Sequence, residues 1–311
     1  MVDKRPALVV IVGPTAVGKT EVAIQLAERV NSEIVSADSR LLYRGLDIGT
    51  AKPSTEQLAR VPHHLIDVAN PDEIWSLALF QRAANEAIEV IHGRGRLPIL
   101  VGGTGQYLRA ILEGWSPPKI TAQPRLRAAL EAWAGELGNA GIHARLAIVD
   151  SVAAGNIDAR NVRRTLRALE VILATGMRFS DQRTRADSPY RVLQIGLTRP
   201  RPELYARIDA RIQQMVDAGW LNEVKALLAK GYDADLPSLS AIGYRQLIDH
   251  LKGKMSPEQA VDEIKRATRL FVRRQANWFK PTDPHIKWFE AAKNNLIDNL
   301  EKEVGSFLHP S

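Results

Sequence analysis

Residues 7–20, which read ALVVIVGPTAVGKT, decide the fold. The apolar run from Ala7 to Val12 is rich in β-branched residues and predicts a buried parallel strand. Residues 13–20 match the pattern G-x-x-x-x-G-K-[ST] at every defined position. From 20 to 30, apolar residues recur at helical spacing. A strand, a glycine-rich loop and a helix in this order predict a phosphate-binding loop.

The chemistry of this loop follows from its residue types. Glycines let the backbone wrap a phosphate, so that successive amide N–H groups point at it. The helix N-terminus adds its positive end, Lys19 adds a charge, and the Thr20 hydroxyl is placed to hold Mg²⁺. We therefore expect a diphosphate or triphosphate ligand with Mg²⁺, and the motif leaves open whether ATP binds. The predicted phosphate-binding residues are Gly13, Pro14, Thr15, Ala16, Val17, Gly18, Lys19 and Thr20.

Outward from the loop, short apolar strands alternate with amphipathic helices. Strands are predicted at 33–37, 97–101 and 191–197, and a helix at 80–91. This alternation is typical of an α/β fold with a parallel sheet, here a P-loop NTPase-like core flanked by helices. Further helices are predicted at 201–217, 219–230, 241–252, 257–280 and from 291.

The segment from 120 to 190 breaks this alternation. It is rich in Ala, Leu and Arg, shows helical periodicity over 162–172 and contains no convincing strand. At about 150 residues per domain, a chain of 311 residues has room for two domains. We therefore predict an all-helical insertion domain at 120–190, and an α/β core with C-terminal helices built from 1–119 and 191–311.

Composition narrows the class of protein. The absence of cysteine excludes disulfides, thiol catalysis and Cys-ligated zinc. The net charge is +7: residues 120–192 carry +4 and residues 199–280 carry +5, while the tail from residue 281 carries −2 and residues 1–119 are neutral. This excess fits a polyanionic partner, although a basic solvated surface would also produce it. No stretch approaches the ~20 apolar residues of a membrane span, so we expect a cytoplasmic protein without membrane contact.

Two polar residues follow predicted strands and are candidates for catalysis. Asp38 comes after the strand at 33–37, and Thr104 lies in the glycine-rich turn after the strand at 97–101. Because the carboxyl ends of parallel strands line one crevice, both side chains should face the phosphate loop. Position alone leaves Asp38 equally consistent with a metal ligand or general base and with a helix N-cap. No Asp follows the strand at 97–101, which lowers the case for phosphoryl transfer.

Further blocks along the chain are far more specific than the loop. After the loop at 13–20, they are SADSR at 36–40, YRGLDIGTAKP at 43–53, HHLID at 63–67, PILVGGTG at 98–105, RALEV at 167–171, TG at 175–176, AIGYRQ at 241–246 and RRQxxWF at 273–279. This series resembles the tRNA dimethylallyltransferases and spans nearly the whole chain up to Phe279. The sequence departs from the family pattern at Leu41, where many relatives have glutamine, and at 155–161.

The resemblance implies a reaction and explains the missing strand-end Asp. The dimethylallyl group of dimethylallyl diphosphate would move to N6 of adenosine-37, next to the tRNA anticodon, and diphosphate would leave. No phosphoryl group is attacked, so the loop would hold a leaving group. The family's pattern implies Asp38 as the general base, Thr104 as an orienting residue, and Arg207 and Arg211 as further diphosphate contacts. The partners would be dimethylallyl diphosphate and the tRNA anticodon stem-loop, and the protein a monomer.

The resemblance also implies a set of tRNA contacts. Arginines such as Arg163 and Arg164 fit backbone phosphates, and the helical insertion would close over the stem-loop. A helix over 264–279 would place Arg266, Arg269 and Arg273 on one face. The predicted tRNA-binding residues are Asp38, Ser39, Arg40, Leu41, Thr104, Val162, Arg163, Arg164, Thr165, Leu166, Gly243, Tyr244, Arg245, Gln246, Arg273 and Arg274.

Two other functions are kept as alternatives. A small-molecule or nucleotide kinase of the phosphate-loop class would bind ATP tightly and transfer a phosphoryl group. A non-catalytic RNA-binding module would need neither Asp38 nor Thr104 in the crevice.

Overall fold

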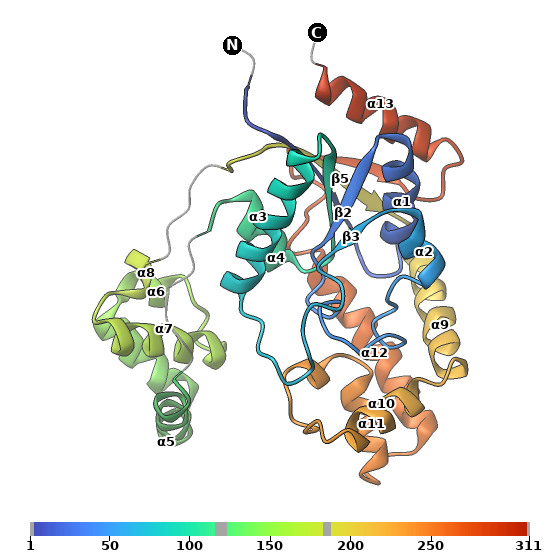
Figure 1. The fold of residues 1–311 in the computed structure, drawn as a ribbon. Coiled ribbons are helices and arrows are strands. Elements are labelled where there is room, and N and C mark those ends of the chain that lie inside the picture. The colour runs from blue at the N-terminus through green and yellow to red at the C-terminus, as the bar shows by residue number, and fades with distance from the viewer. Residues whose placement is uncertain (1–2, 116–122, 183–187, 310–311) are drawn as a thin grey trace. The chain divides into compact units, whose positions relative to one another are not determined.

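The computed structural model describes residues 3–115, 123–182 and 188–309 (Figure 1). The chain divides into two compact units, Met1–Leu112 with Ser188–Ser311 and Glu113–Asp187. The predicted boundary between 119 and 120 lies outside the described residues. Among those residues, no helix has the length and apolar character needed to cross a membrane.

A six-stranded parallel sheet forms the centre of the first unit. Its order is β3-β2-β4-β1-β5-β6, with β1 between β4 and β5. Val9 of β1 faces Ile99 on one side and Leu193 on the other. Residues 8–12 have no exposed surface, as expected for a parallel strand covered on both faces. The strands are β1 Ala7–Val12, β2 Ser32–Ser36, β3 His63–His64, β4 Leu97–Val101, β5 Arg191–Thr198 and β6 Ile286–Glu290.

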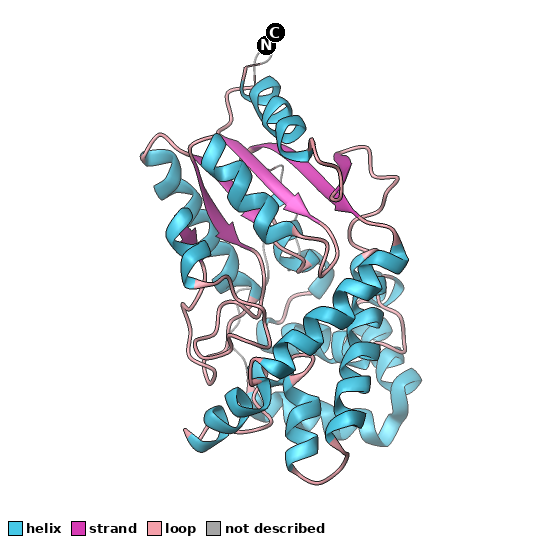
Figure 2. Cartoon of the chain, turned by 90° about the vertical axis from the view of Figure 1, so that its right-hand side faces the viewer, coloured by secondary structure: helices cyan, strands magenta, loops and turns pink. Residues whose placement is uncertain are grey.

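Helices cover this sheet and extend beyond its carboxyl edge (Figure 2). Helices α1 and α3 both contact β2 and β4, and α13 packs beside α1. Helices α9 to α12 gather where the strand arrows point, which places them around the ends of the strands. The helices are α1 Lys19–Arg29, α2 Thr55–Arg60, α3 Leu77–Gly93, α4 Gly105–Leu112, α9 Arg201–Asp217, α10 Trp220–Ala229, α11 Tyr244–Leu251, α12 Pro257–Gln275 and α13 Leu296–Leu308.

The predicted parallel α/β fold is confirmed, but several element predictions were wrong. Strands β3 and β6 were missed, because β3 has two residues and β6, with the sequence IKWFE, carries charged residues at the sheet edge. The predicted helix 257–280 ends at Gln275, and residues 276–279 are turn. Trp278 therefore does not lie on a face of α12. The C-terminal helix begins at Leu296 instead of 291.

The second unit is helical and has its own core. Residues 123–182 contain no strand and fold into α5 Pro124–Val149, α6 Ser151–Gly155, α7 Val162–Thr175 and α8 Phe179–Gln182. Leu130, Ile142, Leu146 and Leu169 are buried together between α5 and α7. Gly138 interrupts α5 with a positive φ of 67° and kinks it.

Candidate active site

A cavity of about 540 Å³ lies in the first unit, against the phosphate loop and the loops that follow β2 and β4. Parallel sheets present ligand crevices at this edge, where successive strands end and the chain turns. The part of the wall beside the phosphate loop and the strand ends comes from Thr15, Ala16, Asp38, Ser39, Arg40, Gly103, Thr104, Arg211, Arg274 and Gln275. The apolar part comes from Ile208, Ile212, Met215, Trp220, Ala241, Ile242, Ile264, Phe271 and Trp278.

The phosphate loop joins β1 to α1 in the geometry that its sequence predicts. A Cβ on Gly13 would stand 2.8 Å from the carbonyl oxygen of Leu197, so the loop packs against β5. Gly18 has a left-handed φ of 114° at the N-cap of α1. The Lys19 ammonium donates to the carbonyls of Gly13 and Pro14, each at 2.9 Å, and so bridges the loop. Thr20, in the first turn of α1, is exposed.

Burial changes the electrostatics of the two cations nearest the loop. It lowers the pKa of Lys19 to about 8, a shift that the nearby Asp38 carboxylate opposes and Arg211 increases. Burial also lowers the pKa of Arg211, against the influence of Asp38 and with that of Arg207. Arg207 is exposed and donates from Nε to the carbonyl of Ala16 at 2.9 Å. An anion bound at this loop would thus meet two partly desolvated cations, where its attraction is strongest.

Asp38 lies in the loop that follows β2, which excludes one of the alternatives that its position left open. Residues 37–50 contain no helix, so the helix N-cap interpretation was wrong. One carboxylate oxygen accepts the N–H of Arg40 at 2.9 Å, which fixes the side chain over its own turn. Thr104 lies opposite, immediately before α4, and its hydroxyl accepts the N–H of Ser39 at 3.2 Å. The two predicted catalytic residues are therefore joined through the neighbouring Ser39.

Gln275 is a site residue to which the sequence assigned no role. It ends α12 with 4% of its surface exposed. Its side-chain carbonyl accepts the N–H of Thr15 at 2.9 Å, and its NH₂ donates to the carbonyl of Gly103 at 3.1 Å. Two signals in the sequence pointed to it: its place in the block RRQxxWF at 273–279, and its position on the apolar face of a basic amphipathic helix. Neither signal names the two partners, which lie 260 and 172 positions away.

The apolar wall was also not predicted as part of the site. Trp220 is 2% exposed and packs edge-on against Tyr244, with ring centroids 5.8 Å apart. The residues of this wall come from α9, α10, α12, the turn after α12 and the segment before α11. An apolar surface beside a phosphate loop suits a ligand with a diphosphate at one end and a hydrocarbon at the other.

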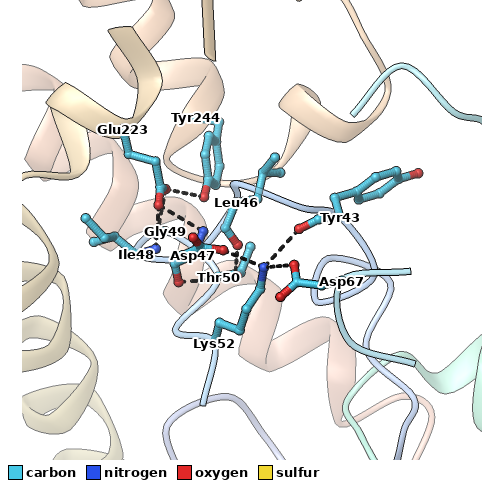
Figure 3. Close-up of polar contacts among 10 residues, drawn as sticks. All are labelled: Tyr43, Leu46, Asp47, Ile48, Gly49, Thr50, Lys52, Asp67, Glu223 and Tyr244. Carbon is cyan, nitrogen blue, oxygen red and sulfur yellow. Dashed lines mark hydrogen bonds and ion pairs between the residues drawn. The ribbon is translucent and has the colours of Figure 1, made fainter. Parts of the chain in front are cut away.

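A single carboxylate holds the loop that follows Tyr43 (Figure 3). Glu223 of α10 accepts the backbone N–H groups of Asp47, Ile48 and Gly49 at 2.9, 2.7 and 3.2 Å, and the Tyr244 hydroxyl at 2.6 Å. Burial raises the pKa of Tyr244 well above its usual range, and the carboxylate of Glu223 adds to this. The hydroxyl is therefore a fixed donor. This arrangement presents Gly49 and Thr50 to the cavity.

Lys52 stabilises the other end of the same loop. Its side chain is 6% exposed, and its ammonium lies between Asp47 and Asp67 while donating to the carbonyl of Tyr43 at 3.0 Å. A buried lysine is stable only with such partners. The block at 43–53 thus has a physical basis, because Asp47, Gly49 and Lys52 all take part in the contacts that hold this loop conformation.

The residues predicted to bind tRNA occupy very different positions. Ser39 and Arg40 line the main cavity, and Leu41 lines a smaller one with Lys19, Thr20 and Asp38. Arg40 donates to the carbonyls of Pro237 and Ser238 at 2.8 and 3.1 Å, which ties the turn to the segment before α11.

Within the stretch at 243–246, only the Arg245 side chain is exposed. Gly243 is buried, and Gln246 accepts the N–H of Gly243 as part of a helix cap. The Tyr244 side chain is buried and packs against Trp220, so it is not available on the surface, and the tRNA contact of this residue stays a prediction.

Arg273 and Arg274 line different surface features. Arg274 lines the main cavity, whereas Arg273 lies with Arg266 and Arg269 along a groove between α9 and α12. The predicted common face of these three arginines is therefore present. Arg269 forms an ion pair with Asp209, and Arg266 forms one with Glu263, so part of the positive charge of this face is neutralised.

In the second unit, the predicted stretch at 162–166 is only partly available. Arg163 and Arg164 are exposed, and Val162 is half-buried. Thr165 and Leu166 lie on the inward face of α7 and belong to the buried interior of the unit. The side chains of Thr165 and Leu166 are therefore not available on the surface, and the tRNA contacts of this stretch stay predictions, as do the phosphate contacts of Arg163 and Arg164.

Comparison with known proteins bears directly on this site. A family model described as IPP transferase matches residues 41–282, and one described as isopentenyl transferase matches residues 6–69. The tRNA dimethylallyltransferase of Roseiflexus sp. (strain RS-1) is 54% identical over 273 residues, 88% of this chain and 90% of the relative. That of Thermomicrobium roseum is 48% identical over 97% of this chain and 92% of the relative.

Solved structures show the same similarity. The full-length tRNA isopentenylpyrophosphate transferase of Bacillus halodurans is 41% identical, with a TM-score of 0.74 over 98% of this chain and 97% of its own. A eukaryotic dimethylallyltransferase acting on tRNA is 26% identical, with a TM-score of 0.79 over 97% of this chain and 78% of its own.

Proposed function

The chain belongs to the IPP transferase family, and on that premise we propose that it transfers a dimethylallyl group from dimethylallyl diphosphate to N6 of adenosine-37 in tRNA. One observation carries the proposal: a phosphate loop, a carboxylate and an apolar wall face the same cavity. This combination supports transfer of a hydrocarbon from a diphosphate. The kinase alternative is not favoured, since the relatives compared above carry transferase names.

The diphosphate would be held by the loop amides, the N-terminus of α1, Lys19 and Arg211. Negative charge grows on the diphosphate as the allylic C–O bond breaks, and fixed positive groups stabilise that charge as it develops. Mg²⁺ fits this chemistry, because Thr20 and Asp38 bring oxygen atoms to one small cavity beside the loop. The Thr20 hydroxyl and diphosphate oxygens would hold the ion, which would supply further charge stabilisation.

The acceptor amine would react on the Asp38 side of the cavity. The N6 nitrogen attacks the allylic carbon, the C–O electron pair leaves with the diphosphate, and one N6 proton passes to the Asp38 carboxylate. The hydrogen bond from Arg40 N–H holds that carboxylate in place. Thr104, linked to Ser39, would orient the amine or the diphosphate. The dimethylallyl group would lie against Trp220 and the apolar wall.

The nucleic-acid partner would enter with its base extruded. Removing a base from its stack costs a few kcal/mol, least in a single-stranded loop such as an anticodon loop. Exposed arginines, among them Arg163, Arg164 and Arg245, would contact its phosphates. We propose that the protein acts as a monomer in the cytoplasm.

The test is a product assay with purified protein, Mg²⁺, labelled dimethylallyl diphosphate and unmodified tRNA. Digested tRNA should contain N6-dimethylallyladenosine, identified by mass. Asp38→Ala should lower the rate by about 10²–10⁴-fold, the usual contribution of a general base. Asp233→Ala, in an exposed loop, is the matched control and should leave the rate unchanged. ATP-dependent phosphorylation of a small acceptor, without prenylated tRNA, would instead support the kinase.

A further inference from the structure

Gln275 joins two turns that are distant in sequence, the phosphate loop and the glycine-rich turn after β4. One end of its side-chain amide receives the N–H of Thr15, and the other donates to the carbonyl of Gly103. The orientation of the amide is determined by these partners. A flipped amide would set NH₂ against N–H and oxygen against oxygen. A buried amide with both ends bonded in this way is held firmly in one place.

The Gln275 amide lies close to the ammonium of the loop lysine, on the side of Gly103. A Cβ on Gly103 would stand 2.4 Å from Nε2 of Gln275 and 3.7 Å from Nζ of Lys19. The amide and the ammonium therefore flank the same point, and glycine at 103 is what permits the approach. Gly105 behaves in the same way, because a Cβ there would stand 2.2 Å from the Trp278 ring. The end of α12 thus closes this side of the phosphate site.

One backbone N–H donor of the phosphate loop is therefore used in a hydrogen bond within the protein. In phosphate loops that hold nucleoside triphosphates, backbone amides cradle the phosphates and the lysine reaches the last two. Here the amide of Thr15 already has a partner. The donors at the start of α1 keep the orientation of helix N-terminal N–H groups. A third phosphate beside Lys19 would have to displace a side chain bonded at both ends.

We infer that Gln275 sets the length of the phosphate chain that the loop accepts, admitting a diphosphate and excluding a triphosphate. The inference rests on the proposed function and deepens it, since it concerns the ligand of the same site. Gln275 is a positioning residue that acts through the loop backbone and through the space it occupies. It would keep cellular ATP out of a site built on the same loop as ATP-binding enzymes.

The test measures binding of two probes, inorganic pyrophosphate and inorganic triphosphate, by calorimetry with Mg²⁺. We expect wild type to bind pyrophosphate more tightly, and the preference to fall about tenfold in Gln275→Ala, the size of one hydrogen bond to a charged group. A merely structural defect would weaken both probes together and leave their ratio unchanged. Gln275→Met, which keeps the length without either hydrogen bond, should shift the ratio in the same direction if the alanine variant fails to fold.

Gln259→Ala is the matched control. This substitution removes a glutamine that accepts the N–H of Ser256 at the opposite end of α12. The ratio of the affinities for pyrophosphate and triphosphate in this variant should equal that of wild type. An unchanged ratio in folded Gln275 variants, or a wild type that binds triphosphate at least as tightly as pyrophosphate, overturns the inference. If wild type binds neither probe, that result would contradict the diphosphate site on which the proposed function depends. Prenylated tRNA with an unchanged ratio would contradict only the role of Gln275.

Discussion

The hydroxyl of Tyr244 donates a 2.6 Å hydrogen bond to Glu223, the carboxylate that also receives three backbone N–H groups of the loop at 47–49. This bond links α11 to α10 and, through Glu223, to a wall of the active-site cavity. The conformation of the loop therefore depends on a half-buried acid and a buried phenol, both outside the sequence block that forms the loop.

Tyr244→Phe should destabilise the protein by about 1.5–3 kcal/mol, because a hydrogen bond to a charged group is lost while the ring is kept. Glu223→Ala should cost more, since it leaves three backbone donors without their acceptor. Urea unfolding measures both free energies. Equal values for the two variants would contradict the view that Glu223 is shared between the tyrosine and the loop.

Gly49→Ala should destabilise the protein by about 1–3 kcal/mol and weaken substrate binding. The new Cβ would stand 2.0 Å from Nε1 of Trp220, and overpacking of this kind costs about that amount. Gly93→Ala is the control, because nothing lies within 4 Å of its Cβ position and its φ is not left-handed. Thermal unfolding and the KM for the diphosphate substrate are the two measurements. A fully stable Gly49→Ala variant would show that the loop can move away from Trp220.

Pyrophosphate affinity should fall as the pH rises through about 8. Burial lowers the pKa of Lys19 to about 8, and the charged ammonium is the form that binds an anion. Binding should therefore be strongest below that value. The folded-state pKa lies below the unfolded one, so Lys19 also makes folding more favourable as pH rises between about 8 and 10.5. Lys19→Ala supplies the baseline for ionisation of the ligand, and a wild-type profile parallel to it would disprove the assignment.

Asp150→Ala should selectively destabilise the helical unit. The carboxylate accepts the N–H of Ala153 at 2.9 Å and that of Ser180 at 2.8 Å, so it caps α6 and holds α8. Burial alone would raise its pKa, but these bonds outweigh burial and hold the pKa below 3.8. Its stabilisation is therefore present above pH 3.8 and is lost as the pH falls through the lower folded value.

We expect a loss of about 1–3 kcal/mol in Asp150→Ala, read by amide hydrogen exchange in residues 123–182. Exposed Asp158→Ala serves as the comparison. Faster exchange spread equally over the α/β unit would argue against a local effect.

The parallel α/β core could be predicted from sequence because its signals are short-range. An apolar run, a complete glycine pattern and helical periodicity lie within 7–30, and backbone sterics over a few residues produce the strand, loop and helix. The edge strand β6 could not be predicted from sequence. Its alternation of apolar and polar residues is weak, and pairing with β5 decides its conformation. The end of α12 was placed too late because the apolar spacing continues through Trp278, while the backbone turns after Gln275.

The sequence by itself determined that a phosphate loop precedes a helix, and that Asp38 and Thr104 follow strands of the same sheet. It did not decide whether Asp38 caps a helix, and the structure answered that, because the loop at 37–50 contains no helix. Only the tertiary structure brought Gln275 to Thr15 and Glu223 to the loop at 47–49. The physical reason is that local dihedral preferences act over a few residues. Hydrogen bonds between partners separated by 260 and 176 positions exist only after burial has brought those segments together.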